Sequence, residues 1–137
     1  MHKISWAEPR IEKEEHAAIK KIIDSNWLTQ GQVTAKLEKK ISQYTGSKYT
    51  VVTNNGTSSL ICSLLSHGIG KNDEVIVPSF TFVASVNAIL SVGAKPILVD
   101  CNPHTFNTDV DFVKNKITKK TKAIMPVDVS GMPVDVD

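Results

Sequence analysis

The sequence predicts an α/β protein with three layers, in which helices cover both faces of a mainly parallel sheet. Short continuous apolar runs, among them Val75–Val77 and Ile97–Val99, alternate with longer segments of helical periodicity. Strands that are covered on both faces have continuous rather than alternating apolar residues, as these runs do. The expected order of elements after the first 46 residues is β-α-β-α-β-α-β.

Two helices are expected before the α/β part. Apolar residues recur at helical spacing over Ile11–Ile23, with charged residues between them. A loop over Asp24–Gln32 then leads to a second helix over Val33–Tyr44, which Gly46 stops. We therefore expect a helical segment at residues 1–46 and an α/β segment at residues 47–137.

The elements of the α/β segment follow from the same patterns. The predicted strands are Tyr49–Thr53, Glu74–Val77, Pro96–Asp100 and Ala123–Val127, and the predicted helices are Thr57–Ser66, Phe82–Val92 and Val110–Ile117. Right-handed crossovers bring the carboxyl ends of parallel strands to one edge of the sheet. Ligands of open α/β sheets bind at that edge.

Composition argues against several classes of partner and location. The 16 basic and 14 acidic residues give a net charge of +2, without the clustered excess that binds nucleic acid or acidic membranes. The sequence has no targeting segment and no apolar run of membrane-spanning length, so a cytoplasmic protein is expected. Cys62 and Cys101 are far apart and form no CxxC pair, which favours reduced thiols.

The segment Asn54–Ser58 lies at a predicted strand-to-helix corner. Gly56 would let the backbone turn and approach a ligand, and the hydroxyls of Thr57 and Ser58 would join the N–H groups of the first helical turn around a phosphate. Alternatively, Thr57 or Ser58 simply caps the helix. From the residues alone the two interpretations are equally favoured. The segment lacks GxGxxG spacing and a Walker lysine, which argues against dinucleotides and nucleoside triphosphates.

Other candidate residues follow the later strands. Phe80 and Phe82 could stack on a planar ring, although a core position is the favoured interpretation from sequence. Asp100 could contact a ligand, but capping of a turn is favoured. The role of Asp128 is ambiguous. The four histidines share no metal-ligand spacing and no GxSxG elbow is present, so neither a metal site nor a hydrolase is expected.

The order of motifs resembles the DegT/DnrJ/EryC1/StrS family of pyridoxal-phosphate-dependent sugar aminotransferases, which has the aspartate aminotransferase fold. The resemblance extends over nearly the whole chain and is carried by Asn26–Gly31, Asn55–Ser58, Gly70–Ala84, Gly93–Pro96, Val99–Asp100, Thr105–Asn107, Thr118–Ile124 and Pro126–Asp135. An ordered series of this length is far more specific than any one motif.

The resemblance implies roles for particular residues. Gly56, Thr57 and Ser58 would hold the phosphate of pyridoxal 5'-phosphate, and Phe82 would stack on its ring. The segment Thr29, Gln30 and Gly31 would approach the substrate or a partner subunit. Asp128 stands where many relatives have a histidine, and we assign it no role.

The resemblance also implies a reaction and a missing part. The expected substrates are a nucleotide-linked keto sugar and an amino-acid donor, and the expected assembly is a homodimer. The family's Schiff-base lysine and the carboxylate that pairs with the pyridine nitrogen would lie beyond Asp137, so we expect the isolated chain to be an inactive N-terminal portion of the large domain. The alternatives are a sugar dehydratase of the same fold and a non-catalytic module that binds a phosphate ligand.

Overall fold

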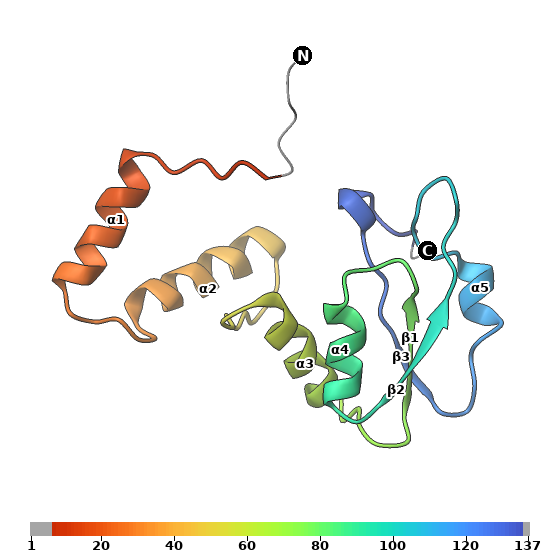
Figure 1. Ribbon diagram of the computed structural model, residues 1–137. Coiled ribbons are helices and arrows are strands. Elements are labelled where there is room, and N and C mark those ends of the chain that lie inside the picture. The colour runs from red at the N-terminus through yellow and green to blue at the C-terminus, as the bar shows by residue number, and fades with distance from the viewer. Residues whose placement is uncertain (1–6, 136–137) are drawn as a thin grey trace, which may run out of the picture. The chain divides into compact units, whose positions relative to one another are not determined.

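The computed structural model describes residues 7–135, and the chain divides between Val52 and Thr53 into two units. The first unit is helical and the second is α/β (Figure 1). Residues 1–6, where the sequence predicts no targeting segment, lie outside the described residues. Within residues 7–135 no helix has the length and apolar character needed to cross a membrane.

The first unit contains the two predicted helices, with ends within two residues of the prediction. They are α1 (Lys13–Asp24) and α2 (Gln32–Thr45). The Glu12 N–H donates to Glu15 Oε2 at 2.8 Å, and this hydrogen bond holds the pKa of Glu15 below its ordinary value. Helix α2 stops as predicted at Gly46, whose φ of 73° lies in the left-handed region that glycine adopts without strain.

The predicted strand Tyr49–Thr53 is wrong. The segment pairs with no strand in the described part of the chain, and Tyr49 and Val51 are 78% and 79% exposed. The Val52 N–H donates instead to Glu38 Oε1 at 3.1 Å. A run of β-branched residues favours an extended backbone, but a β-strand also needs a neighbouring strand to pair with. This segment has no such neighbour among the described residues.

The sheet lies in the second unit and is parallel, as predicted. It consists of β1 (Glu74–Pro78), β2 (Lys95–Val99) and β3 (Thr121–Ile124) in the order β2-β1-β3. Strand β3 begins two residues earlier than predicted and ends three residues earlier. After Met125, whose N–H still donates to Ile76, Pro126 has no N–H to continue the ladder.

Helices cover both faces of the sheet and complete the three predicted layers (Figure 1). Helices α3 (Gly56–Ser66) and α4 (Ala84–Ser91) cover one face, where Val75 and Val77 join their core residues. Helix α5 (Val110–Lys114) covers the other face, where Ile76 packs with Val113. Strand β1 is therefore the buried centre of the unit.

Two of these helices are shorter than predicted. Helix α4 begins two residues later, because Phe82 is still in the preceding turn, where its carbonyl accepts a hydrogen bond from the Ser85 N–H at 3.1 Å. Helix α5 ends three residues earlier, and the next residues continue as isolated turns, with the Lys116 N–H donating to Val113 O. The types and order of both elements are as predicted.

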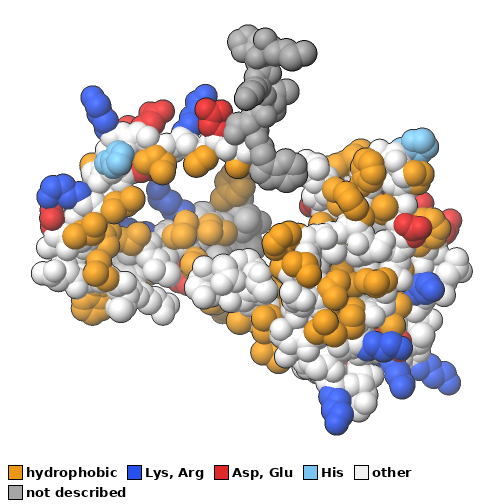
Figure 2. Space-filling view, viewed as in Figure 1, with side chains coloured by type: hydrophobic (Ala, Val, Ile, Leu, Met, Phe, Trp, Pro, Cys, Tyr) orange, Lys and Arg blue, Asp and Glu red, His pale blue; other side chains and the backbone are white. Residues whose placement is uncertain are grey.

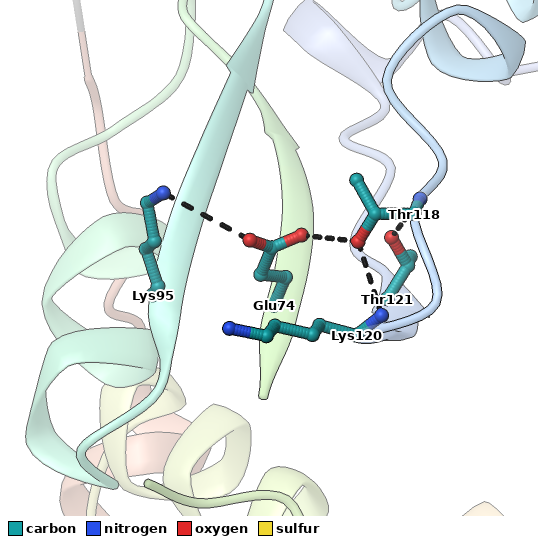
Figure 3. Close-up of polar contacts among 5 residues, drawn as sticks. All are labelled: Glu74, Lys95, Thr118, Lys120 and Thr121. Atoms are coloured by element: carbon teal, nitrogen blue, oxygen red, sulfur yellow. Dashed lines mark hydrogen bonds and ion pairs between the residues drawn. The ribbon is translucent and has the colours of Figure 1, made fainter. Parts of the chain in front are cut away.

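Polar contacts at the amino end of β1 tie the three strands together. Glu74 is buried, and its Oε2 accepts a hydrogen bond from Thr118 Oγ1 at 2.6 Å (Figure 3). Its Oε1 lies 3.8 Å from Lys95 Nζ at the start of β2. The backbone N–H of Glu74 donates to Lys120 O. This end of the sheet is therefore closed by protein contacts.

The neighbouring residues Ile89 and Leu90 test this core. Ile89 is fully buried under the sheet, whereas Leu90 is more than half exposed. We expect Ile89→Ala to lower the free energy of unfolding by about 2–5 kcal/mol because it leaves a cavity, and Leu90→Ala to change it by less than about 0.5 kcal/mol. Urea unfolding followed by circular dichroism measures both, and equal effects would contradict the assigned helix face.

Candidate functional site

The predicted corner at Asn54–Ser58 forms the start of α3, and Asn55 is its N-cap. The Asn55 side chain accepts a hydrogen bond from the Ser58 N–H at 2.8 Å. The alternative that Thr57 or Ser58 caps the helix is therefore wrong. Asparagine is as good a cap as serine. The sequence analysis considered only the hydroxyl residues Thr57 and Ser58, which lie two and three residues after the actual cap.

Capping by Asn55 leaves four polar groups of the first turn without a hydrogen bond in the described part of the chain. They are the N–H groups of Gly56 and Thr57 and the hydroxyls of Thr57 and Ser58. Ser59 is different, since its Oγ lies 2.6 Å from Thr53 Oγ1. Unpaired donors at a helix N-terminus, with its partial positive charge, suit an anion such as phosphate.

Gly56 is not required by the turn itself. Its φ lies outside the left-handed region, and a Cβ built on it would meet no atom within 4 Å. Folding would therefore tolerate a side chain here. The sequence analysis suggested another reason for glycine at this position, which is that a ligand approaches the backbone closely. That reason remains.

The two phenylalanines after β1 are not core residues, so the favoured sequence interpretation is wrong. Phe82 is 78% exposed. Phe80 is half exposed, and its ring centroid lies 5.4 Å from that of Phe106, which has a φ of 60°. A core position was expected because Phe82 was placed inside the following helix. Helix α4 begins only at Ala84, so both phenylalanines lie in the segment before it. The exposed Phe82 ring is free to pack against a planar ligand.

Asp100 and Asp128 both close turns. Asp100 Oδ1 accepts a hydrogen bond from the Cys101 N–H at 2.8 Å, as the favoured interpretation predicts. Asp128 Oδ1 accepts one from the Val134 N–H at 2.9 Å and so spans the loop that follows β3. Both carboxylates are exposed to solvent.

Asn107 fixes the same loop and was missed from sequence. Its side chain is buried, with the residue 6% exposed, and its Nδ2 donates to Met132 O at 2.9 Å and Pro133 O at 3.0 Å. Its Oδ1 accepts from the Val129 N–H at 3.1 Å. These bonds hold η1 (Val129–Gly131), a single turn whose central residue Ser130 has a φ of 54°. The partners lie 22 to 26 residues away, beyond any local sequence signal.

The predicted segment Thr29–Gly31 belongs to the first unit, where Trp27 folds over it. Trp27 Nε1 donates to Gln30 O at 3.0 Å. A Cβ on Gly31 would lie 2.5 Å from Trp27 Nε1 and 2.9 Å from its Cδ1, so a side chain here would require the indole to move. Thr29 and Gln30 are exposed. Glycine at position 31 thus allows the indole to lie against this turn.

The second unit brings the corner and Phe82 to one end of the sheet. Helices α3 and α4 both begin at the end of the unit where β1 finishes (Figure 1). Gly56, Thr57 and Ser58 lie in the first turn of α3, and Phe82 lies just before α4. This end is the carboxyl edge of the sheet, where the fold places ligands.

Fold and site together define a class: a three-layer α/β unit with a phosphate-suited helix start and an exposed aromatic ring at the carboxyl edge. A model of the DegT/DnrJ/EryC1/StrS aminotransferase family matches residues 9–137. The chain is 42% identical over 136 residues to GDP-perosamine synthase of Caulobacter vibrioides, a match that covers 98% of this chain and 37% of that protein. The chain therefore belongs to the DegT/DnrJ/EryC1/StrS aminotransferase family.

Solved structures agree on the fold. Spr1654 of Streptococcus pneumoniae, a proposed sugar aminotransferase solved in forms with PLP and PMP, superposes with a TM-score of 0.92 at 38% identity, covering 98% of this chain and 34% of that one. PseC of Helicobacter pylori, an aminotransferase in pseudoaminic acid biosynthesis, gives a TM-score of 0.87 at 29% identity and covers 98% and 37%. The chain thus has the aspartate aminotransferase fold and spans about a third of the length of these relatives.

Asn107→Ala tests the loop after β3. We expect it to lower the free energy of unfolding by about 1–3 kcal/mol, because it removes the three hydrogen bonds of a buried side chain. The Val129 amide should also exchange with solvent faster, as measured by NMR hydrogen exchange. Asn87→Ala is the control, since Asn87 is exposed on α4 and its side chain makes no hydrogen bond in the described chain. An unchanged Val129 amide in Asn107→Ala would refute the assignment.

Gly31→Ala tests the turn under Trp27. The added methyl group should displace the indole, so the Trp27 Nε1–H resonance should shift and exchange faster with solvent. Substituting Trp6 with phenylalanine first leaves Trp27 as the only indole to follow by NMR. In a Trp27→Ala background the same Gly31→Ala change should have no effect on stability. A cost that persists without the indole would show that Gly31 is needed for another reason.

Proposed function

We propose that this chain is part of a pyridoxal-phosphate-dependent enzyme that transfers an amino group from an amino-acid donor to a nucleotide-linked keto sugar. The observation that supports it most is the start of α3, where Asn55 caps the helix. Within residues 7–135 the N–H groups of Gly56 and Thr57 and the hydroxyls of Thr57 and Ser58 are left without hydrogen-bond partners. Membership of a sugar aminotransferase family supports the reaction class. The homodimer that the resemblance implies and the cytoplasmic location expected from the sequence belong to the same proposal.

The residues present fit the cofactor. A phosphate needs several donors that converge without a competing carboxylate, and the first turn of α3 supplies two N–H groups and two hydroxyls and contains no acidic residue. The space next to Gly56 is open. The exposed Phe82 ring offers a face for the pyridine ring.

In this proposal the residues of the chain bind and orient. Gly56, Thr57 and Ser58 hold the phosphate, and Phe82 packs on the ring and keeps water from that face. When bound, pyridoxal phosphate would supply an electron-withdrawing ring that stabilises negative charge on the carbon that carries the transferred amino group. We assign no proton transfer to a residue of this chain, because the lysine and carboxylate that the resemblance implies are not among residues 7–135.

A chimera tests the proposed function. Residues 1–137 replace the matched third of the Caulobacter vibrioides GDP-perosamine synthase, and formation of GDP-perosamine is followed together with cofactor absorbance after gel filtration. We expect a yellow protein that forms product. A folded chimera that contains no cofactor and forms no product would contradict the proposal.

Variants of the chimera locate the phosphate. Gly56→Ala keeps the helix start but puts a methyl group in the open space, and we expect cofactor affinity to fall at least about tenfold, or about 1.4 kcal/mol. Ser58→Ala should weaken binding by about two- to tenfold, as expected for loss of one hydrogen bond. Ser63→Ala, on the same helix, is the matched control and should bind normally. Equal affinity of Gly56→Ala and the unmodified chimera would refute the corner as the phosphate site.

A further inference from the structure

Asn55 and Gly56 form the one Asn-Gly pair in the whole sequence. Such a pair is chemically labile, because the backbone nitrogen of the glycine can attack Cγ, the side-chain carbonyl carbon of the asparagine. A Cβ on the second residue would hinder this attack, and glycine has none. The pair also lies at the start of α3, where the helix cap meets the proposed phosphate donors. Its reactivity therefore bears on the candidate site.

Both reacting groups of this pair are available in the folded chain. The Gly56 N–H makes no hydrogen bond within residues 7–135, so its attack would break none. The cap bond from the Ser58 N–H to Oδ1 holds Asn55 Cγ at the first turn of α3, to which Gly56 belongs. Asn55 Nδ2, the leaving group, has no partner among the described residues. Both residues are exposed to water, and helix ends fray readily.

Other asparagines of the second unit lack this combination. Asn54 is the adjacent residue and is also exposed, but the residue after it, Asn55, has a side chain. Asn107 is buried, and both ends of its amide are bonded to the loop after β3. Asn54 is thus an internal control that differs from Asn55 mainly in the residue that follows.

We propose that Asn55 is a site of spontaneous deamidation, that a phosphate bound at the start of α3 blocks the reaction, and that its products weaken phosphate binding. The Gly56 nitrogen bonds to Asn55 Cγ, its proton goes to the side-chain amide, and ammonia leaves, which gives a cyclic succinimide. Water then opens the ring at one carbonyl or the other and gives aspartate or isoaspartate. No other reactant is needed. The two statements about phosphate rest on the proposed function, whereas the deamidation itself does not.

Both products oppose a bound phosphate. Aspartate caps a helix about as well as asparagine, so α3 stays formed, but it places a negative charge beside the donors. Residues 49–66 contain no basic side chain to balance it. Most of the charged side chains visible on the second unit lie toward α5 and the amino ends of the strands (Figure 2). Isoaspartate adds a carbon to the backbone before Gly56 and so displaces the Gly56 N–H.

Incubation of the free chain, with circular dichroism to show that it is folded, tests the deamidation. Trypsin cuts after Lys48 and Lys71 and releases a peptide in which Asn54 and Asn55 are the only asparagines, so fragmentation in a mass spectrometer assigns each product. We expect Asn55 to convert at least about tenfold faster than Asn54. Gly56→Ala should slow Asn55 to the rate of Asn54. Equal rates in the unmodified chain, or no slowing in Gly56→Ala, would overturn the proposal.

The chimera with the Caulobacter vibrioides enzyme tests the protection. Pyridoxamine phosphate is the probe, since it has no aldehyde that would react with lysines, and pyridoxamine without the phosphate is its control. We expect the probe to slow conversion of Asn55 at least about tenfold and the control to leave it unchanged. Rapid conversion in a chimera that retains the probe on gel filtration would overturn the protection. A chimera that retains none would contradict the proposed function and the protection together, but not the deamidation, which the free chain decides.

Two cap variants of the chimera test the effect of the products. Asn55→Asp reproduces one product, and Asn55→Ser keeps an uncharged cap. We expect Asn55→Asp to bind pyridoxamine phosphate at least about tenfold more weakly than Asn55→Ser, because the carboxylate repels the phosphate. Equal affinities of the two variants would overturn the statement that deamidation weakens the site.

Discussion

Burial of β1 on both faces is the constraint on which the second unit depends. Val75, Ile76 and Val77 are completely inaccessible to solvent, and they point alternately toward the α3 and α4 layer and the α5 layer. A strand in this position can bury no unpaired backbone group, so it needs a neighbour on each side. The parallel partners β2 and β3 supply them, and parallel pairing in turn requires crossovers that carry helices over the faces. The three layers follow from one continuous apolar run.

The same constraint separates the two ends of the sheet. At the amino end, Glu74 joins the strands through Thr118 and Lys95 (Figure 3). At the carboxyl end, the chain leaves β1 through Phe80 and Phe82, and the loops after the three strands are fastened to one another by contacts such as the Phe80–Phe106 ring pair. The ring pair holds these loops in place. The first turn of α3 and the Phe82 ring take no part in such contacts and face outward. The proposed ligand site and the Glu74 contacts thus lie at opposite ends of the strands.

The parts of the fold that could be predicted from sequence are those with local causes. Apolar runs predicted β1 and the parallel sheet, and Gly46 predicted the end of α2, because burial on two faces and left-handed φ values leave direct marks on residue type. The prediction of a strand at Tyr49–Thr53 was wrong because strand formation depends on a pairing partner, which a local sequence pattern does not reveal. The structural role of Asn107 could not be predicted for a similar reason, since its three hydrogen-bond partners lie in a loop far along the chain. At the site, residue types suggested phosphate chemistry, but only the Asn55 cap distinguishes groups used for the helix from groups left over.

Exposed apolar residues in the second unit therefore have two different explanations, which their positions separate. Phe82 lies at the carboxyl edge, at the same end of the unit as donors suited to phosphate, and a planar ligand would cover it. Ile124 lies at the lateral edge, where β3 has no second neighbouring strand within residues 7–135. Burying either side chain is worth about 1.5–3 kcal/mol, so the hydrophobic gain is similar at the two places and does not select the occupant. The polar groups at each place distinguish them, because N–H groups and hydroxyls at a helix start suit an anion, whereas the backbone groups of a strand edge suit another strand.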